Sequence, residues 1–115
     1  MNIKLPEPIE NYLRSSETGD LEKAAAAFAP DATVFDEGED TNVVGREAIH
    51  RWMTEYTSKY KTTLEVTDMV EEDGEVILTT LVSGNFQGSP AEFRYRFALR
   101  DGLIDRLVVE FVGFK

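Results

Sequence analysis

The sequence contains no cysteine and only one histidine, His50, among its 115 residues. The absence of cysteine excludes disulfides, thiol nucleophiles, iron–sulfur clusters and thiolate zinc sites. A single imidazole also excludes a metal site built from several histidines. Enzyme classes that depend on any of these groups are therefore excluded by composition alone.

Basic residues are few compared with acidic ones. The chain has 12 lysine and arginine residues against 22 aspartate and glutamate residues, which gives a formal net charge of −10. A charge of this sign repels phosphate backbones and anionic lipid headgroups. We therefore expect no nucleic acid among the partners of this protein.

Long hydrophobic runs are also missing. The longest wholly apolar run is residues 24–29, far short of the roughly 20 residues that span a bilayer. The first ten residues, MNIKLPEPIE, contain no apolar core of a signal peptide. We expect a soluble, cytoplasmic protein that does not bind membranes. The 42% hydrophobic share suits a globular fold, and we expect residues 1–115 to form one domain.

Three segments have the apolar spacing of amphipathic helices. The first covers residues 7–16, and the second begins after the N-cap Asp20 and ends at Pro30. The third begins after Gly45, and its apolar face leaves His50 outside. The apolar positions of the three helices are Ile9, Tyr12 and Leu13, then Leu21, Ala24, Ala25 and Phe28, then Ile49, Trp52, Met53, Tyr56 and Tyr60.

The rest of the chain has the patterns of β-strands. A short strand is predicted at residues 32–36, bounded by an acidic loop. Turn signals that contain glycine separate four further strands, which form an antiparallel meander. These strands are predicted at residues 62–71, 75–87, 91–100 and 103–112. Together the elements predict an α+β domain with a curved sheet packed over three helices.

The last strand predicts a dimer. Its residues Leu107, Val109 and Phe111 point one way and Ile104, Val108 and Val112 point the other, so both faces are apolar. No helix remains to cover the outer face. We therefore expect a homodimer in which a second copy of the sheet covers it.

The order of these elements and several residues resemble the SnoaL-like proteins of the nuclear transport factor 2-like superfamily. The resemblance covers nearly the whole chain, and its members include ketosteroid isomerases and polyketide cyclases. It implies a cone-shaped fold in which the sheet and the helices enclose a pocket for a small molecule. The residues that carry it are Gly19-Asp20-Leu21, Phe28 to Asp36, Gly45 to Ile49 and Phe97 to Ile104.

Ketosteroid isomerase is the catalytic relative that the residues resemble most, and its chemistry is a known example of tuned carboxylates. The resemblance implies that Asp36 is a general base and that Tyr12 is a hydrogen-bond donor to the developing oxyanion. Two positions depart from the isomerase. Tyr95 stands where its second donor is an aspartic acid, and Met53 stands where a tyrosine supports the first donor.

The orientation of one strand decides whether Asp36 can act. Because side chains alternate along a strand, Asp36 faces the pocket if Val34 does, and faces solvent if Phe35 takes the inward side. Burial in an apolar pocket would raise the pKa of Asp36 from its ordinary ~3.9. Tyr12 and Tyr95 have the alternative of a packing role, since aromatic residues at such spacings usually belong to the core.

The leading hypothesis is proton transfer on a small hydrophobic carbonyl compound, of the isomerase or cyclase type, without a cofactor. A pocket wall is predicted from Phe28, Val34, Trp52, Met53, Tyr56, Phe97 and Phe111. The rival hypothesis is a ligand-binding or association module without chemistry. The acidic run from Asp36 to Asp40 lacks a calcium-loop pattern, so no metal is expected. Arg94 and Arg96 are expected to pair with acidic side chains on the outer sheet face.

Overall fold

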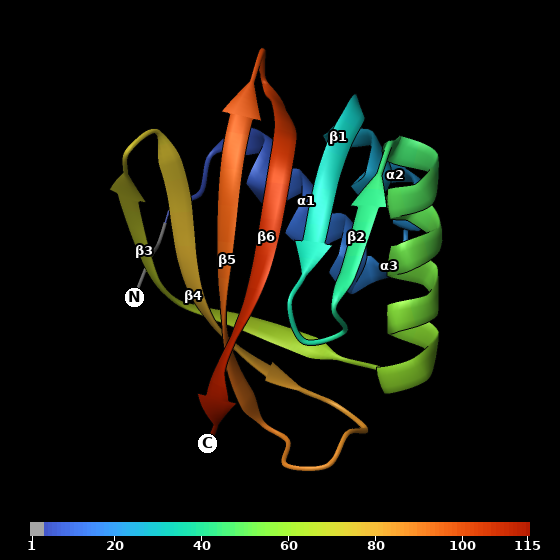
Figure 1. The fold of residues 1–115 in the computed structure, drawn as a ribbon, viewed down its shortest axis with the longest axis vertical. Helices are drawn as coiled ribbons and strands as arrows, with labels where there is room; N and C mark the ends of the chain where they lie inside the picture. The colour runs from blue at the N-terminus through green and yellow to red at the C-terminus, as the bar shows by residue number, and fades with distance from the viewer. Residues whose placement is uncertain (1–3) are drawn as a thin grey trace.

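The computed structural model describes residues 4–115, and for residues 56–60 it describes the backbone alone. Three helices and six strands follow the order predicted by the patterns, with one additional strand (Figure 1). The helices are α1 (Glu7–Thr18), α2 (Leu21–Ala26) and α3 (Arg46–Tyr60). The strands are β1 (Phe28–Asp36), β2 (Thr41–Val44), β3 (Thr63–Glu72), β4 (Glu75–Ser83), β5 (Ala91–Arg100) and β6 (Leu103–Phe114).

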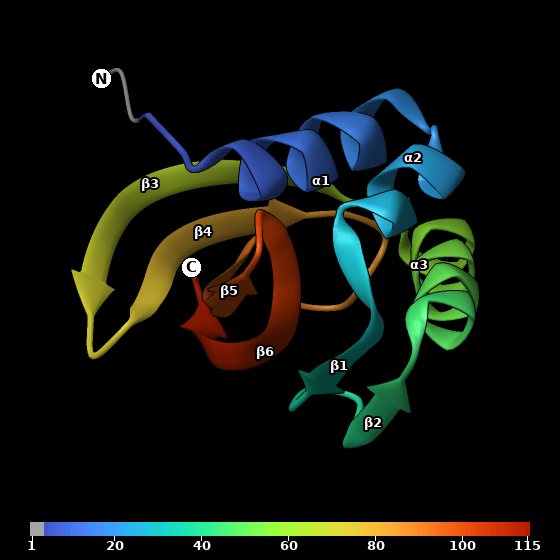
Figure 2. The same cartoon turned by 90° about the horizontal axis from the view of Figure 1, so that it is seen from above.

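The six strands form one sheet in the order β2-β1-β6-β5-β4-β3. All neighbouring pairs are antiparallel except β1 and β6, which are parallel. The sheet bends, and the helices lie on its hollow side (Figure 2), where α1 crosses the long strands and α3 stands beside β1 and β2. The predicted α+β architecture with a curved sheet is confirmed.

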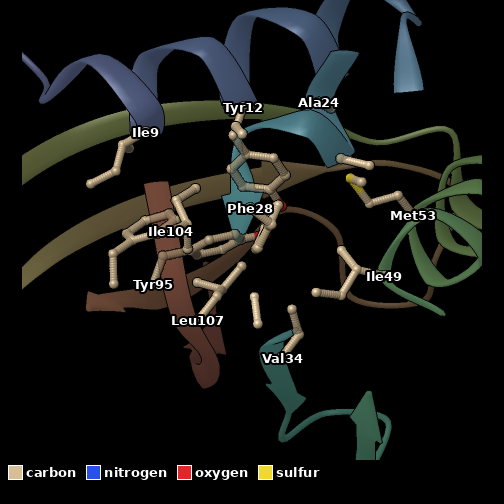
Figure 3. Packing of buried hydrophobic residues seen from close by; sticks show 14 of the residues in the cluster. Ile9, Tyr12, Ala24, Phe28, Val34, Ile49, Met53, Tyr95, Ile104 and Leu107 are labelled. Carbon is tan, nitrogen blue, oxygen red and sulfur yellow. The ribbon is translucent and has the colours of Figure 1, made fainter. Parts of the chain in front are cut away.

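The core lies between the hollow face of the sheet and the helices. Tyr12 of α1 and Ile49 of α3 point toward Phe28 and Leu107 of the sheet (Figure 3). Tyr12 packs edge to face on Phe28, with ring centroids 5.2 Å apart, and also contacts Phe97 at 6.1 Å. Fully burying side chains of this size stabilises a fold by about 1.5–3 kcal/mol each, so this cluster accounts for a large part of the folding energy.

The helix ends follow local chemistry. The carboxylate of Asp20 accepts a hydrogen bond from the backbone N–H of Lys23 at 3.2 Å, as predicted for the N-cap of α2. The predicted end of α2 at Pro30 is wrong, because the helix ends at Ala26 and Phe28 is the first residue of β1. Tertiary packing favours this arrangement, since Phe28 is fully buried in the core.

A guanidinium fastens α3 to the start of β1. Arg46, the first residue of α3, donates from Nε and Nη2 to the backbone carbonyl oxygen of Phe28 at 3.0 and 2.6 Å. The neighbouring N–H of Gly45 donates to the carbonyl oxygen of Ala32 at 2.8 Å. These bonds fix the helix against the strand that carries Val34 and Asp36.

Three strand predictions need correction. Residues 41–44 form β2, which pairs with β1 across the acidic turn that the patterns left as a loop. The predicted strand 75–87 ends at Ser83. In β6 a register shift between its pairs with Ala98 and Leu99 turns Ile104 into the core, where it is 0% exposed. The prediction that Ile104 lies on the outer face is therefore wrong.

The outer sheet face carries ion pairs and some exposed apolar side chains. Arg96 lies on this face and pairs with Glu110 at 2.7 Å and with Glu75 at 3.6 Å. Phe35 of β1 is 37% exposed and Val70 of β3 is 46% exposed. In the described part of the chain, no helix has both the length and the apolar character needed to cross a membrane.

Candidate functional site

Asp36 is the last residue of β1 and belongs to the buried side of that strand. Val34 is 0% exposed and Asp36 is 2% exposed, whereas Phe35 between them is 37% exposed. Asp36 pairs with Val109 of the parallel neighbour β6, so the carboxyl follows an apolar row on the hollow face of the sheet. Of the two orientations left open by the sequence, the structure has the one that turns Asp36 inward.

The Asp36 carboxylate accepts hydrogen bonds from one indole and from backbone N–H groups of the turn that follows it, Gly38 and Glu39. The indole Nε1–H of Trp52 on α3 donates to Oδ2 at 3.2 Å, and the backbone N–H of Glu39 donates to Oδ1 at 3.4 Å. Burial raises the pKa of Asp36 above its ordinary value, and the negative charge of Glu39 adds to the rise. The bond from Trp52 opposes this change without cancelling it.

A cavity of about 400 Å³ opens beside this carboxyl, and we call it the acid cavity. Its walls come from the turn after β1, the loop after β4, and strands β5 and β6. The residues that line it are Asp36, Glu37, Gly38, Glu39, Phe86, Gln87, Ala91, Phe93, Phe111 and Phe114. An apolar hollow of this size with one buried acid matches the usual composition of a small-molecule site.

Phenylalanine rings form most of the wall of the acid cavity. Phe93 and Phe111 meet edge to face with centroids 5.6 Å apart, and Phe111 meets Phe114 in the same way at 5.0 Å. Gly88 has φ +89°, and a Cβ built on it would lie 2.7 Å from the ring of Phe114. The absence of a side chain at Gly88 therefore lets Phe114 occupy its present position.

A second cavity, of about 380 Å³, lies between α1, α3, β3 and β5, and we call it the tyrosine cavity. Among its lining residues are Tyr12, Trp52, Met53 and Tyr95. No residue of the described part lines both cavities. Trp52 connects them, because its ring lines the tyrosine cavity while its N–H bonds to Asp36.

The predicted site residues are thus distributed over three places. Asp36 and Phe111 line the acid cavity, while both tyrosines line the other cavity with Trp52 and Met53. Three residues predicted to form the pocket wall are 0% exposed in the core and line neither cavity: Phe28, Val34 and Phe97. Their wall prediction is corrected to packing, because the ring of Tyr12 fills the space before Phe28 and Phe97. The side chain of Tyr56 lies outside the described residues.

Three phenylalanines of the acid cavity were missed by the sequence analysis. Phe93 carried a usable signal, since it shares the inward alternation of Tyr95 in β5. Phe86 lies in the loop after β4, inside the predicted strand 75–87, and Phe114 lies beyond the predicted end of β6 at residue 112. For these two residues the sequence pattern held no signal.

The remaining candidates do not form a metal site. Among the residues described, no group of three or more histidine, aspartate or glutamate side chains is arranged to hold a metal ion. His50 is half-buried on α3 and lines neither cavity.

The curved sheet, the helices on its hollow side and the buried acid define a protein of the nuclear transport factor 2-like fold. The family profile for the SnoaL-like domain matches residues 9–107, and the chain belongs to that family. None of the curated proteins compared with the chain matches it.

Solved structures extend this result. A candidate polyketide cyclase from Sinorhizobium meliloti is 31% identical, with a TM-score of 0.86, and the match covers 92% of this chain and 95% of the other. A protein with a ketosteroid isomerase-like fold from Catenulispora acidiphila, in complex with trimethylamine, is 17% identical with a TM-score of 0.81, covering 92% and 85% of the two chains. TerC, co-crystallised with polyporic acid, is 16% identical with a TM-score of 0.80, covering 92% and 89%. The last two likenesses show the fold alone.

Proposed function

We propose that this protein binds a small hydrophobic carbonyl compound in the acid cavity and that Asp36 moves a proton on the carbon next to the carbonyl group. The reaction is of the isomerase or cyclase type and uses no cofactor. One observation carries the proposal: a carboxyl that is 2% exposed lines an apolar cavity of about 400 Å³.

The surroundings of Asp36 suit a general base. A base works best when its pKa approaches the working pH, and burial raises the pKa of Asp36 in that direction. Trp52 holds one carboxylate oxygen at 3.2 Å, which fixes the orientation of the group. The other oxygen accepts a long bond of 3.4 Å from the Glu39 N–H, and a substrate proton can compete with this bond.

Tyr12 and Tyr95 are proposed as donors to the oxyanion only for a ligand that reaches into the tyrosine cavity. Both line that cavity together with Trp52. A ligand confined to the acid cavity meets Asp36 without either phenol. Tyr12→Phe and Tyr95→Phe separate the two cases, since they slow turnover only of substrates that extend past Trp52.

The experiment uses a panel of carbonyl compounds, namely cyclohexanone, indanone and tetralone, in deuterium oxide. Exchange of hydrogen for deuterium next to the carbonyl is followed by proton NMR. We expect Asp36→Asn to slow the exchange by at least about 100-fold, the usual lower bound for a general base. Asp40→Asn is the matched control, because Asp40 is exposed in the same turn and lines neither cavity. Equal rates for wild type and Asp36→Asn would contradict the mechanism.

A second candidate function is a binding module without catalysis. It is favoured by the separation of Asp36 from Tyr12 and Tyr95 into different cavities. The solved relatives that hold trimethylamine and polyporic acid support a small-molecule ligand under either function. Binding of indanone to the acid cavity with no exchange above the buffer rate would select this candidate.

A further inference from the structure

The charges that line the acid cavity are all of one sign. Asp36, Glu37 and Glu39 are acidic, and none of the lining residues within the described part is basic. The nearby chain end offers no compensation, because the ammonium group of Lys115 pairs with Glu92 at 3.2 Å. An anionic ligand would meet three carboxyl groups and no counter-charge, so this cavity disfavours carboxylates and phosphates.

The rest of the wall has the chemistry that attracts organic cations. Phe86, Phe93, Phe111 and Phe114 all line the same hollow, and the last three form a chain of edge-to-face contacts. The faces of aromatic rings attract ammonium groups, above all alkylated ones that are weakly hydrated. A buried carboxylate beside such rings supplies the counter-charge.

A neutral apolar ligand would use only part of this arrangement. It would fill the space between the rings, but it would leave Asp36 buried at 2% exposure with the negative charge of Glu39 beside it. A cationic ligand relieves that cost, since it interacts with the rings and with the carboxylate together. The formal net charge of −10 also draws cations toward the chain.

We propose that the acid cavity selects ligands that carry an alkylated ammonium group, placed between the phenylalanine rings and Asp36. This inference rests on the proposed function, because it assigns the ligand class of the same cavity.

The test compares three ligands that share a benzyl group and differ in charge: benzyltrimethylammonium, benzyl methyl sulfone and phenylmethanesulfonate. Dissociation constants are measured at neutral pH and low salt by calorimetry, and NMR shift changes at Asp36 and Phe93 locate the ligand. We expect the cation to bind at least about tenfold more tightly than the neutral sulfone, as ring and carboxylate interactions together allow. The anionic sulfonate should bind most weakly.

Two variants and one control identify the groups responsible. Phe111→Leu keeps an apolar wall but removes a ring face. It should raise the dissociation constant of the cation by about fivefold and leave that of the sulfone nearly unchanged. Phe86→Leu is a second variant of the same kind if Phe111→Leu does not fold. Phe35→Leu is the control, because Phe35 is 37% exposed, as Phe111 is, but lies on the outer sheet face. It should change neither affinity.

The outcomes separate this inference from the proposed function. If the sulfone binds in the acid cavity as tightly as the cation, or if Phe111→Leu and Phe35→Leu have equal effects, the ammonium preference is wrong while the cavity remains a binding site. If none of the three ligands binds at millimolar concentration, the ammonium inference fails. The carbonyl exchange experiment then decides separately whether the proposed function fails too.

Discussion

Replacing Asp36 by asparagine should stabilise the folded protein at neutral pH. Burial of a carboxylate costs several kcal/mol in desolvation, whereas a good hydrogen bond to a charged group returns about 1.5–3 kcal/mol. The bonds from Trp52 and from the Glu39 N–H are long, at 3.2 and 3.4 Å, and the hydrogen bonds to Asp36 together do not offset the cost. Burial therefore raises the pKa of Asp36 from the ordinary value of 3.8.

The pH dependence follows from this direction. Between pH 3.8 and the higher pKa of the folded state, the folded protein binds more protons than the unfolded chain, so its stability falls as the pH rises through that window. Above the window the loss is complete, and it amounts to about 1.4 kcal/mol for each pKa unit of elevation. Asparagine has no charge to desolvate, and its side-chain oxygen can still accept the N–H of Trp52.

The assay measures the free energy of urea unfolding of wild type and Asp36→Asn between about pH 3 and pH 8. This range begins below the ordinary carboxyl pKa and extends well above it. The stability advantage of the variant should grow with pH. Its growth should equal about 1.4 kcal/mol multiplied by the elevation of the Asp36 pKa, which carbon NMR measures independently. Asp40→Asn is the exposed control and should show no such growth. A difference between wild type and Asp36→Asn that does not change with pH would refute the reasoning.

Three further predictions concern the bond from Trp52, the packing of phenylalanine rings and the outer sheet face. Trp52→Phe removes the indole donor that lowers the pKa of Asp36, so carbon NMR should show a higher pKa than in wild type; an unchanged or lower value would contradict the assigned role of this bond. Phe97→Ala leaves a cavity at a fully buried position and should lower the free energy of unfolding in urea by about 3–5 kcal/mol. Phe114→Ala should lower it far less, because Phe114 is 61% exposed. Sedimentation velocity should give twice the chain mass of 13.0 kDa for wild type, and Phe35→Glu should shift the protein toward the monomer; a wild-type monomer at micromolar concentration would remove the dimer prediction.

Local periodicity was sufficient for most of the elements. The stripe of Ile9 and Tyr12 predicted α1, and the turn signals on either side of residues 91–100 predicted β5 with its observed bounds. Periodicity did not predict a strand that forms only because it pairs with a neighbouring strand. Residues 41–44 are too short to show a pattern, and they form β2 because the turn after Asp36 brings them beside β1.

The candidate site was predicted in part for the same reason. The family resemblance singled out Asp36, whereas alternation along the strand left two orientations open, and the structure has the inward one. Phe86 and Phe114 come together only when the loop after β4 reaches the end of β6, and no spacing in the sequence records that approach. The assignment of Phe28 and Phe97 to the wall was wrong. Alternation indicates on which side of the sheet a side chain lies, but it does not indicate whether another side chain fills the space in front of it.

The bare backbone at Gly88 makes the width of the acid cavity adjustable from a residue that does not itself line it. Any side chain there would be strained at φ +89° and would push the ring of Phe114 aside. A substitution at this one position would thus change the shape of the acid cavity without replacing Asp36. Under the proposed function, the breadth of ligands and the reactivity of Asp36 would then depend on separate parts of the chain.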